Sequence, residues 1–377
     1  MSDKFETRLD KLQQHIKQQE LDLVIIFRRS EIFFLSDTSQ DGVLCIERDA
    51  IPQLFLRNGF ERAKNESVLP VKKIKSYSDL KNHLSAPSSI GFEEMAPTGL
   101  FWRFQKLFPN ANFQSITPVL RELRALKAPD EIALIKKAGT LTDLGINVAI
   151  EQIKPGMSEL ELVAKIEYAM RKEGHQEAIQ FHNFNSILTQ HVISGLNAAI
   201  PSEGATPLMG KGLSSSFPFG VSRRKIQEDE PLIVDIVAKY QGWLADQTRT
   251  IWLGKLSKKL DDAYLACQEI LKAIVDSAKI GITAEELYTL GLEKAREYGY
   301  ESAFMGNAPF IGHGLGLEID ELPILAKNQT ISLQEGMAVA IEPKIVFKDI
   351  GAVGIENTYV MENGKLIEVT NAPIQVQ

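Results

Sequence analysis

The sequence has very few cysteines, which limits the chemistry open to it. Cys45 and Cys267 are the only two in 377 residues, and they lie far apart in apolar surroundings. Neither belongs to a pair with the spacing of a metal site or a redox motif. We therefore expect two buried thiols that take no part in function.

Long apolar runs and basic clusters are also missing. No uninterrupted apolar stretch reaches the roughly 18 residues that span a bilayer, and the polar N-terminus shows no secretion signal. The formal net charge is −7 without a basic stripe, which argues against nucleic acid as a partner. We expect a cytoplasmic protein that acts on a small molecule and binds neither a membrane nor nucleic acid.

The first third of the chain has the pattern of an α/β domain. Residues 22–57 contain short apolar runs that predict strands, namely LDLVIIF, SEIFFLSD, GVLCIERD and PQLFLRN. A polar N-terminal helix, a strand at 89–94 and a helix at 98–108 complete the pattern. A charged connector then leads to a long helix after Pro129. We predict an amino-terminal domain over 1–125 and a second domain over 126–377.

The second domain contains an internal repeat. Residues 154–174 and 279–299 match in layout at an offset of 125 residues. Each has a Ser or Thr followed three residues later by Glu, the pattern of a capping box, and each ends in Gly where a left-handed cap belongs. The repeat predicts two similar halves, each a helix pair followed by β-structure, with the functional site at their seam.

Two predicted hairpins carry acidic residues inside apolar strands. Asp235 and Asp246 lie on the two strands of 231–254, with a turn near Gln241 and Gly242. Glu342 and Glu356 interrupt a similar pattern near the C-terminus. A carboxylate in an apolar strand is costly unless it is paired or binds a cation, so either Asp alone could equally be a cap or a partner of a buried arginine.

One histidine adds a nitrogen ligand to these oxygens. We expect His313 to lie in a glycine-rich loop, within IGHGLGLEIDELP, where backbone can approach a ligand closely. A lone histidine there is more often structural. Four carboxylates and one imidazole on two related halves, however, suit two bridged divalent cations.

These residues carry a family resemblance. The chain resembles the creatinase, prolidase and aminopeptidase P family of pita-bread metalloenzymes over almost its whole length. The resemblance rests on the Asp pair eleven residues apart, GHGLGLE, the IEP strand and the IENT strand, in that order. It implies an α/β amino-terminal domain followed by an α+β pita-bread catalytic domain with two pseudo-symmetric halves, and commonly a homodimer.

The resemblance also implies roles for single residues. The implied metal ligands are Asp235, Asp246, His313, Glu342 and Glu356. Two of them, Asp246 and Glu356, would bridge two divalent metal ions, and Glu342 would also be the general acid and base. Manganese or cobalt is the expected metal, with iron or zinc as alternatives.

The sequence departs from the peptidases of this family at three substrate-side positions. Asp320 stands where a peptidase histidine precedes Glu, Ser202 replaces another histidine, and Gly354 replaces an arginine. Asp320 would then be a catalytic or substrate-facing group, unless it only caps the turn before Pro323 or pairs with a lysine.

Two other residues offer compensation for these losses. His191 could bind substrate in place of a missing histidine, although a lone histidine on an apolar strand is more often part of the core. Lys344, after IEP, is unusual and offers positive charge.

The leading interpretation is a dinuclear metal-dependent hydrolase of the Xaa-Pro dipeptidase type, which cleaves a C–N bond in a small peptide-like substrate. One alternative keeps the fold but changes the chemistry, as in creatinase-like hydrolases or lyases acting on dimethylsulfoniopropionate. Another is a metal-binding module without catalysis, like the pita-bread domains of histone chaperones. Retention of all five ligand types counts against the last.

Overall fold

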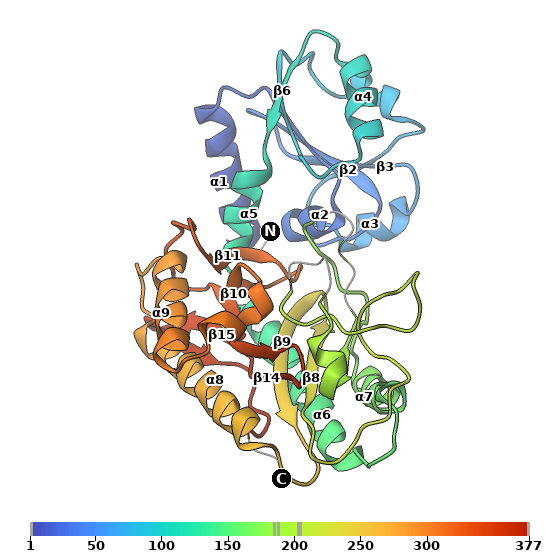
Figure 1. The fold of residues 1–377 in the computed structure, drawn as a ribbon. Helices are drawn as coiled ribbons and strands as arrows, with labels where there is room; N and C mark the ends of the chain where they lie inside the picture. Colours follow the sequence, from blue (N-terminus) through green and yellow to red (C-terminus); the bar gives the residue numbers. More distant parts are fainter. Residues whose placement is uncertain (1–2, 184–185, 187–188, 202–205, 375–377) are drawn as a thin grey trace. The chain divides into compact units, whose positions relative to one another are not determined.

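The computed structural model describes residues 3–183, 186, 189–201 and 206–374. The chain divides into two compact units, Met1–Arg124 and Ala125–Gln377. Figure 1 shows both as layers of strands covered by helices.

The smaller unit is built on one six-stranded sheet. Strand β1 (Leu23–Ile26) runs antiparallel to β2 (Gly42–Glu47) and parallel to β5 (Ser89–Phe92). The remaining strands are β3 (Gln53–Leu56), β4 (Val71–Lys73) and β6 (Asn112–Ser115). The order of all six strands in the sheet is β4-β3-β2-β1-β5-β6. The helices are α1 (Asp3–Gln18), α2 (Arg29–Ser36), α3 (Phe60–Glu66), η1 (Tyr77–Asn82), α4 (Thr98–Leu107) and α5 (Thr117–Ala125).

One predicted strand of this unit is wrong. The segment SEIFFLSD forms helix α2, in which Ile32, Phe34 and Leu35 are buried. The Ser36 hydroxyl donates to the Ile32 carbonyl four residues earlier, at 2.6 Å, and Asp37 ends the helix with a φ of 64°. A short apolar run fits a buried helix as well as a buried strand, so periodicity could not separate them.

The larger unit consists of two halves, each with two helices and an adjoining sheet. The first half contains α6 (Pro129–Gln152), α7 (Glu159–Lys172), β7 (His191–Ser194), η2 (Gly195–Ala199), β8 (Leu232–Tyr240) and β9 (Trp243–Ile251). The second contains α8 (Lys258–Ser277), α9 (Ala284–Glu297), η3 (Glu301–Ala303), η4 (Met305–Asn307), β10 (Phe310–Gly314), β11 (Glu321–Ala326), β12 (Ala338–Ile341), β13 (Lys344–Phe347), β14 (Gly351–Gly354), β15 (Asn357–Glu362) and β16 (Lys365–Glu368).

The sheets of the two halves run between the helix pairs. The first half has the sheet β7-β8-β9, and the second has β11-β10-β12-β15-β16 with a separate β13-β14 hairpin. In Figure 1, α8 and α9 lie on one side of these strands and α6 and α7 on the other. Each half packs its helices on its own strands in a separate hydrophobic core.

The predicted repeat is present at both helix starts. The hydroxyl of Ser158 accepts from the Glu161 amide, and that of Thr283 accepts from the Glu286 amide, so both capping boxes form. Gly174 and Gly299 follow the helices with φ values of 100° and 80°. The same local chemistry therefore begins and ends α7 and α9, as expected for two similar halves.

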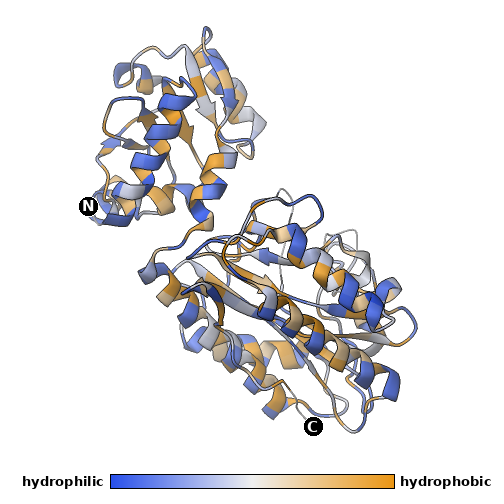
Figure 2. Cartoon of the chain, turned by 90° about the vertical axis from the view of Figure 1, so that its left-hand side faces the viewer, coloured by the Kyte–Doolittle hydropathy of each residue, from blue (hydrophilic) through white to orange (hydrophobic). Residues whose placement is uncertain are grey.

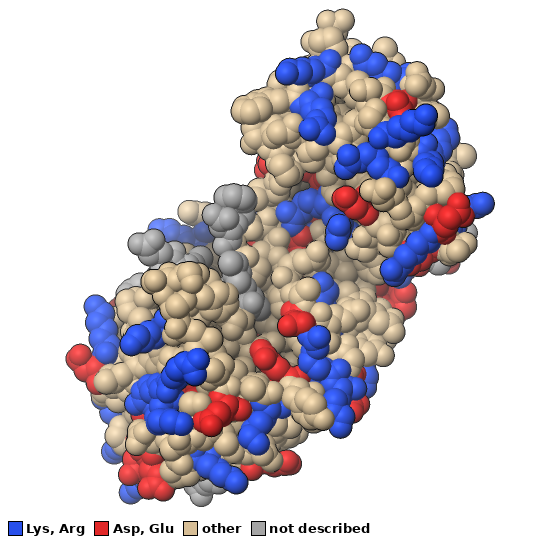
Figure 3. Space-filling model, turned by 90° about the vertical axis from the view of Figure 1, so that its right-hand side faces the viewer, with Lys and Arg blue, Asp and Glu red and all other residues tan. Residues whose placement is uncertain are grey.

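The surface carries polar residues of both signs. Figure 2 shows helices of the larger unit with hydrophilic and hydrophobic residues along the same helix, as amphipathic packing on a sheet requires. On the face drawn in Figure 3, basic and acidic side chains are interspersed. Among the described helices, none combines the length and the apolar character needed to traverse a bilayer.

Helix α6 packs closely on the C-terminal segment through a glycine. A Cβ atom on Gly139 would lie 2.7 Å from the Val369 carbonyl oxygen. That backbone is held in place, because the Val369 amide donates to the Thr358 carbonyl at 2.9 Å. Glycine is therefore needed here for close approach, even though it weakens a helix.

We predict that Gly139→Ala lowers the free energy of unfolding by about 1–3 kcal/mol, because overpacking outweighs the roughly 1 kcal/mol gained in helix propensity. Asn147→Ala, at an exposed position of the same helix, is the control and should be neutral or stabilising. Urea unfolding of both variants tests this, and an increase in stability for Gly139→Ala would contradict the packing argument.

Candidate metal centre

The two aspartates point to the same face of the β8–β9 hairpin. Asp246 lies opposite Val237, which is two residues from Asp235, and residues two apart share a face of a strand. The turn is formed by Gln241 and Gly242 with φ values of 46° and 92°, as a tight hairpin requires. The hairpin predicted from the sequence is confirmed.

The two glutamates come from the second half, but Glu356 does not lie within a strand as its pattern predicted. It occupies the break between β14 and β15, where it pairs with Thr248 of β9. The Glu356 amide donates to the Thr248 carbonyl at 3.1 Å, and the Thr248 hydroxyl donates to Glu356 Oε2 at 2.7 Å. This bridge joins the two halves. Glu342 directly follows β12.

His313 lies in strand β10 and not in a loop. Its neighbours are glycines because other strands approach closely: a Cβ atom on Gly312 would lie 2.4 Å from the Ala340 carbonyl oxygen, and one on Gly314 would lie 2.3 Å from that of Leu322. His313 Nδ1 lies 3.2 Å from the Gly314 carbonyl oxygen. A proton on Nδ1 satisfies that acceptor and leaves the Nε2 lone pair available as a ligand.

These elements bring three ligand residues into one cluster. Asp246, His313 and Glu356 each offer an atom, and these atoms all lie within 4.8 Å of one another. His313 Nε2 is 3.9 Å from Asp246 Oδ2 and 3.7 Å from Glu342 Oε1. The fourth carboxylate, that of Asp235, is connected to this cluster by Lys344, whose ammonium contacts both Asp235 and Glu356.

The buried oxygens of this cluster fit a divalent cation. Asp246 and Glu356 are 5% and 1% exposed. Within the described residues, Asp246 Oδ1 and Glu356 Oε1 have no hydrogen-bond partner. Burial raises the pKa of both carboxyls, and the charge of Glu356 raises that of Asp246 further. Buried carboxylate oxygens beside an imidazole are a donor set typical of manganese, cobalt, iron or zinc.

A lysine also lies inside the acidic cluster. Lys344 Nζ is 2.5 Å from Glu342 Oε2, 3.1 Å from Glu356 Oε2 and 3.2 Å from Asp235 Oδ2. Burial alone would lower the pKa of Lys344, but the three carboxylates outweigh it and hold the pKa well above its ordinary value. The sequence predicts that Lys344 offers positive charge, and the structure places that charge among the three carboxylates.

His191 lies next to the centre in the neighbouring strand. It pairs with Asp235 across β7 and β8, and its Nε2 is buried without a hydrogen-bond partner among the described residues. Burial lowers the pKa of His191, and the Asp235 charge opposes that effect. The imidazole is therefore a neutral group with one nitrogen available beside the cluster.

The adjacent acids Asp320 and Glu321 make different contacts. Asp320 Oδ1 accepts from the His182 amide at 2.7 Å. Glu321 accepts from the amides of Leu317 and Glu318 and lies 2.9 Å from Lys127 Nζ. Glu321 thus closes the turn after β10.

The other two departures from the peptidase pattern have different outcomes. Gly354 lies opposite Lys344 in the β13–β14 hairpin. Ser202 lies outside the residues that the structure describes.

Sequence reasoning missed Thr248 and the contact between Gly354 and Lys344. Thr248 follows Asp246 by two residues and therefore shares its face of β9. That spacing could have identified it as a hydrogen-bond partner in the centre. Gly354 gave no such signal, because its contact with Lys344 depends on the register of a separate hairpin.

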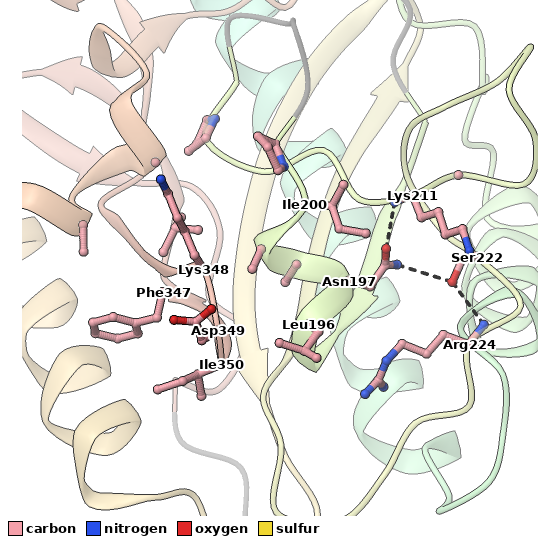
Figure 4. A pocket seen from close by; sticks show the side chains of 18 of the residues that line it. Leu196, Asn197, Ile200, Lys211, Ser222, Arg224, Phe347, Lys348, Asp349 and Ile350 are labelled. Carbon is pink, nitrogen blue, oxygen red and sulfur yellow. Dashed lines mark hydrogen bonds between the residues drawn. The ribbon is translucent and has the colours of Figure 1, made fainter.

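A pocket of about 1280 Å³ lies beside η2 and the β13–β14 hairpin. Figure 4 shows Leu196 and Ile200 on one wall and Phe347 and Lys348 on the other. Asn197 supports the pocket by accepting from the Lys211 amide at 2.7 Å. The residues that line it include none of the five predicted ligands, so this pocket is separate from the metal cluster.

Two family models match the chain. Residues 133–363 match "Metallopeptidase family M24", and residues 8–126 match "Creatinase/Prolidase N-terminal domain". The chain is 31% identical over 361 residues to the Xaa-Pro dipeptidase of Pyrococcus furiosus, covering 95% of this chain and 96% of that protein. It is 30% identical to the Xaa-Pro dipeptidase of Pyrococcus horikoshii, covering 95% of each chain.

Solved structures show the same likeness. The prolidase from Pyrococcus horikoshii superposes with a TM-score of 0.86 at 28% identity, covering 98% of this chain and 100% of that one. The Xaa-Pro dipeptidase from Bacillus anthracis gives 0.86 at 25% identity, covering 99% of each. The pita-bread fold is thereby confirmed. The chain therefore belongs to metallopeptidase family M24, the creatinase, prolidase and aminopeptidase P family of dinuclear metalloenzymes, and is a metal-dependent hydrolase.

Proposed function

We propose that this chain is an Xaa-Pro dipeptidase-like enzyme that hydrolyses the C–N bond of a small peptide-like substrate. The observation that carries the proposal is the cluster of Asp246, His313 and Glu356, in which Asp246 Oδ1 and Glu356 Oε1 are buried without a hydrogen-bond partner among the described residues. The two Pyrococcus relatives named Xaa-Pro dipeptidase align over 95% of the chain, which supports the same class of substrate.

We infer that the cofactor is manganese or cobalt, with iron or zinc as alternatives. Asp246, His313, Glu342 and Glu356 would hold it, and Asp235 completes the set of five that the resemblance implies. A bound divalent cation supplies a Lewis acid for the scissile carbonyl and lowers the pKa of water toward neutrality. How many ions the centre holds depends on Lys344.

The protein's own contribution would be positioning and proton transfer. Glu342 would take a proton from the attacking water and deliver it to the leaving nitrogen, so the hydroxyl group joins the carbonyl carbon as the C–N bond breaks. Its Oε2 accepts from Lys344 at 2.5 Å and its Oε1 faces His313. These two contacts fix the carboxylate in one orientation, and His191 would hydrogen-bond the substrate from β7.

We predict that Asp246→Ala removes the bound metal and the activity while the fold is retained. The reason is that Asp246 would be a ligand of the metal, and that its loss relieves repulsion with the buried Glu356 carboxylate, so the fold does not depend on it. Elemental analysis of purified protein measures the metal, and circular dichroism measures the fold. Asp276→Ala, an exposed change in α8, is the control. Equal metal content in Asp246→Ala and wild type would remove Asp246 from the site.

We predict that Asp320 disfavours substrates with a free C-terminal carboxylate, because it would place negative charge where peptidases of this family place a histidine. Wild type should prefer dipeptide amides over the free acids. Both Asp320→Asn and Asp320→His should lower the ratio of the turnover rate of the amides to that of the free acids.

Asn is the sharper variant, since it keeps an acceptor for the His182 amide and removes only the charge. Turnover of Gly-Pro-like acids and their amides by the three proteins gives the comparison. The same ratio of rates in all three would mean that Asp320 only holds the backbone of His182.

A second candidate function is a hydrolase or lyase acting on a small substrate that is neutral or cationic at the end facing Asp320. It is favoured by Asp320 and by the replacement of the family arginine with Gly354. A panel of proline dipeptides and small betaines, assayed with each metal, separates the two candidates. Turnover of proline dipeptides at rates above those of betaines would support the dipeptidase.

We also infer a cytoplasmic homodimer, by analogy with enzymes of this family. The molecular mass of one chain is 42.0 kDa, so light scattering at micromolar concentration should give about twice that value. A mass near that of one chain would contradict the inference.

A further inference from the structure

The ammonium of Lys344 occupies the part of the centre that contains Asp235. Its three carboxylate contacts are to Asp235, Glu342 and Glu356, at 2.5–3.2 Å. Under the family resemblance, Asp235 would bind a second ion together with the bridging carboxylates of Asp246 and Glu356. Lys344 thus binds oxygens of two of the residues that this second ion would use.

Lys344 has little room to move away from these oxygens. The residue is 2% exposed, and its stem packs on the opposite strand, where a Cβ atom on Gly354 would lie 2.4 Å from Lys344 Cγ. An ammonium withdrawn from its carboxylates would remain buried without a counter-ion, which is unfavourable. The lysine is therefore a built-in cation of the centre.

Gly354 is the matching change on the opposite strand. Lys344 and Gly354 are direct partners in the β13–β14 register. Any side chain at position 354 would meet the stem of Lys344, so the family arginine at this position and the lysine cannot share the space. The two departures from the family pattern therefore belong together, because the glycine at position 354 leaves the space that the stem of Lys344 fills.

The remaining ligand atoms form a second, separate group. Asp246 Oδ1 and Glu356 Oε1 have no hydrogen-bond partner among the described residues, and both residues cluster with His313. Lys344 forms no ion pair with Asp246 in the described structure. A carboxylate–imidazole set of this kind can hold one cation.

We propose that Lys344 takes the place of the second divalent ion, so that each chain binds a single ion at Asp246, His313, Glu342 and Glu356. The inference rests on the proposed function, because it assumes that this centre is the metal site. It changes the chemistry of the centre: an ammonium contributes charge and three hydrogen-bond donors, but it offers no coordination position to substrate or water. One Lewis acid and one fixed cation would then act on the substrate.

Manganese binding tests the proposal directly. Wild-type protein is stripped with chelator and dialysed against excess Mn²⁺, and the bound metal per chain is measured by elemental analysis after removal of free ion. We expect one ion per chain. Its electron paramagnetic resonance spectrum should be that of an isolated Mn²⁺ ion, without the exchange coupling of a bridged pair.

The variant Lys344→Ala should gain a metal ion. Without the ammonium, Asp235 and Glu356 regain oxygens for a cation, so the variant should bind two ions per chain and give a coupled spectrum. Lys348→Ala, an exposed lysine of the same hairpin, is the matched control and should bind one. If Lys344→Ala does not fold, the wild-type stoichiometry still decides the question.

The outcomes separate this inference from the proposed function. Two ions per chain in wild type would overturn the role of Lys344 and leave the metal-dependent function intact. No bound manganese would overturn the proposed metal site and the inference together. One ion in wild type and two in Lys344→Ala would support both.

Discussion

Four carboxylates gathered in a buried centre must be neutralised, and the rest of the larger unit is arranged around this constraint. Asp246, Glu342 and Glu356 are each at most 5% exposed, and like charges at such distances in a poorly solvated site repel strongly. Cations relieve this repulsion and leave the carboxylates ionised. The buried Lys344 and the metal that the family implies both supply positive charge that offsets the repulsion between the carboxylates.

The two-half architecture explains how residues from distant parts of the sequence meet. The first half supplies aspartates from one hairpin, and the second supplies a histidine and glutamates from strands and a strand break. Paired backbone hydrogen bonds between Thr248 and Glu356 fasten one set to the other. Because strands and the residues directly beside them carry the ligands, the backbone fixes where each side chain starts, which is what precise electrostatic catalysis requires.

Local chemistry made much of this predictable from the sequence. Capping boxes, the Gln241–Gly242 turn and the β8–β9 hairpin each have a short-range cause, and all appear in the structure. The strand predicted where helix α2 lies was wrong, because a short buried apolar run has no distinctive period. His313 was expected in a loop, yet its glycines serve the packing of β11 and β12 against β10. That packing involves residues distant in sequence, so no local pattern could reveal it.

The exchange between positions 344 and 354 shows the limit of reading single residues. Taken alone, Gly354 is a lost arginine and Lys344 is an odd substitution after a proline. Their register makes them neighbours, and the missing side chain of one leaves the space that the stem of the other fills. Positive charge therefore lies inside the centre on Lys344 of β13. Since a family resemblance is judged residue by residue, it counts two unrelated differences where the β13–β14 register makes the two positions direct neighbours.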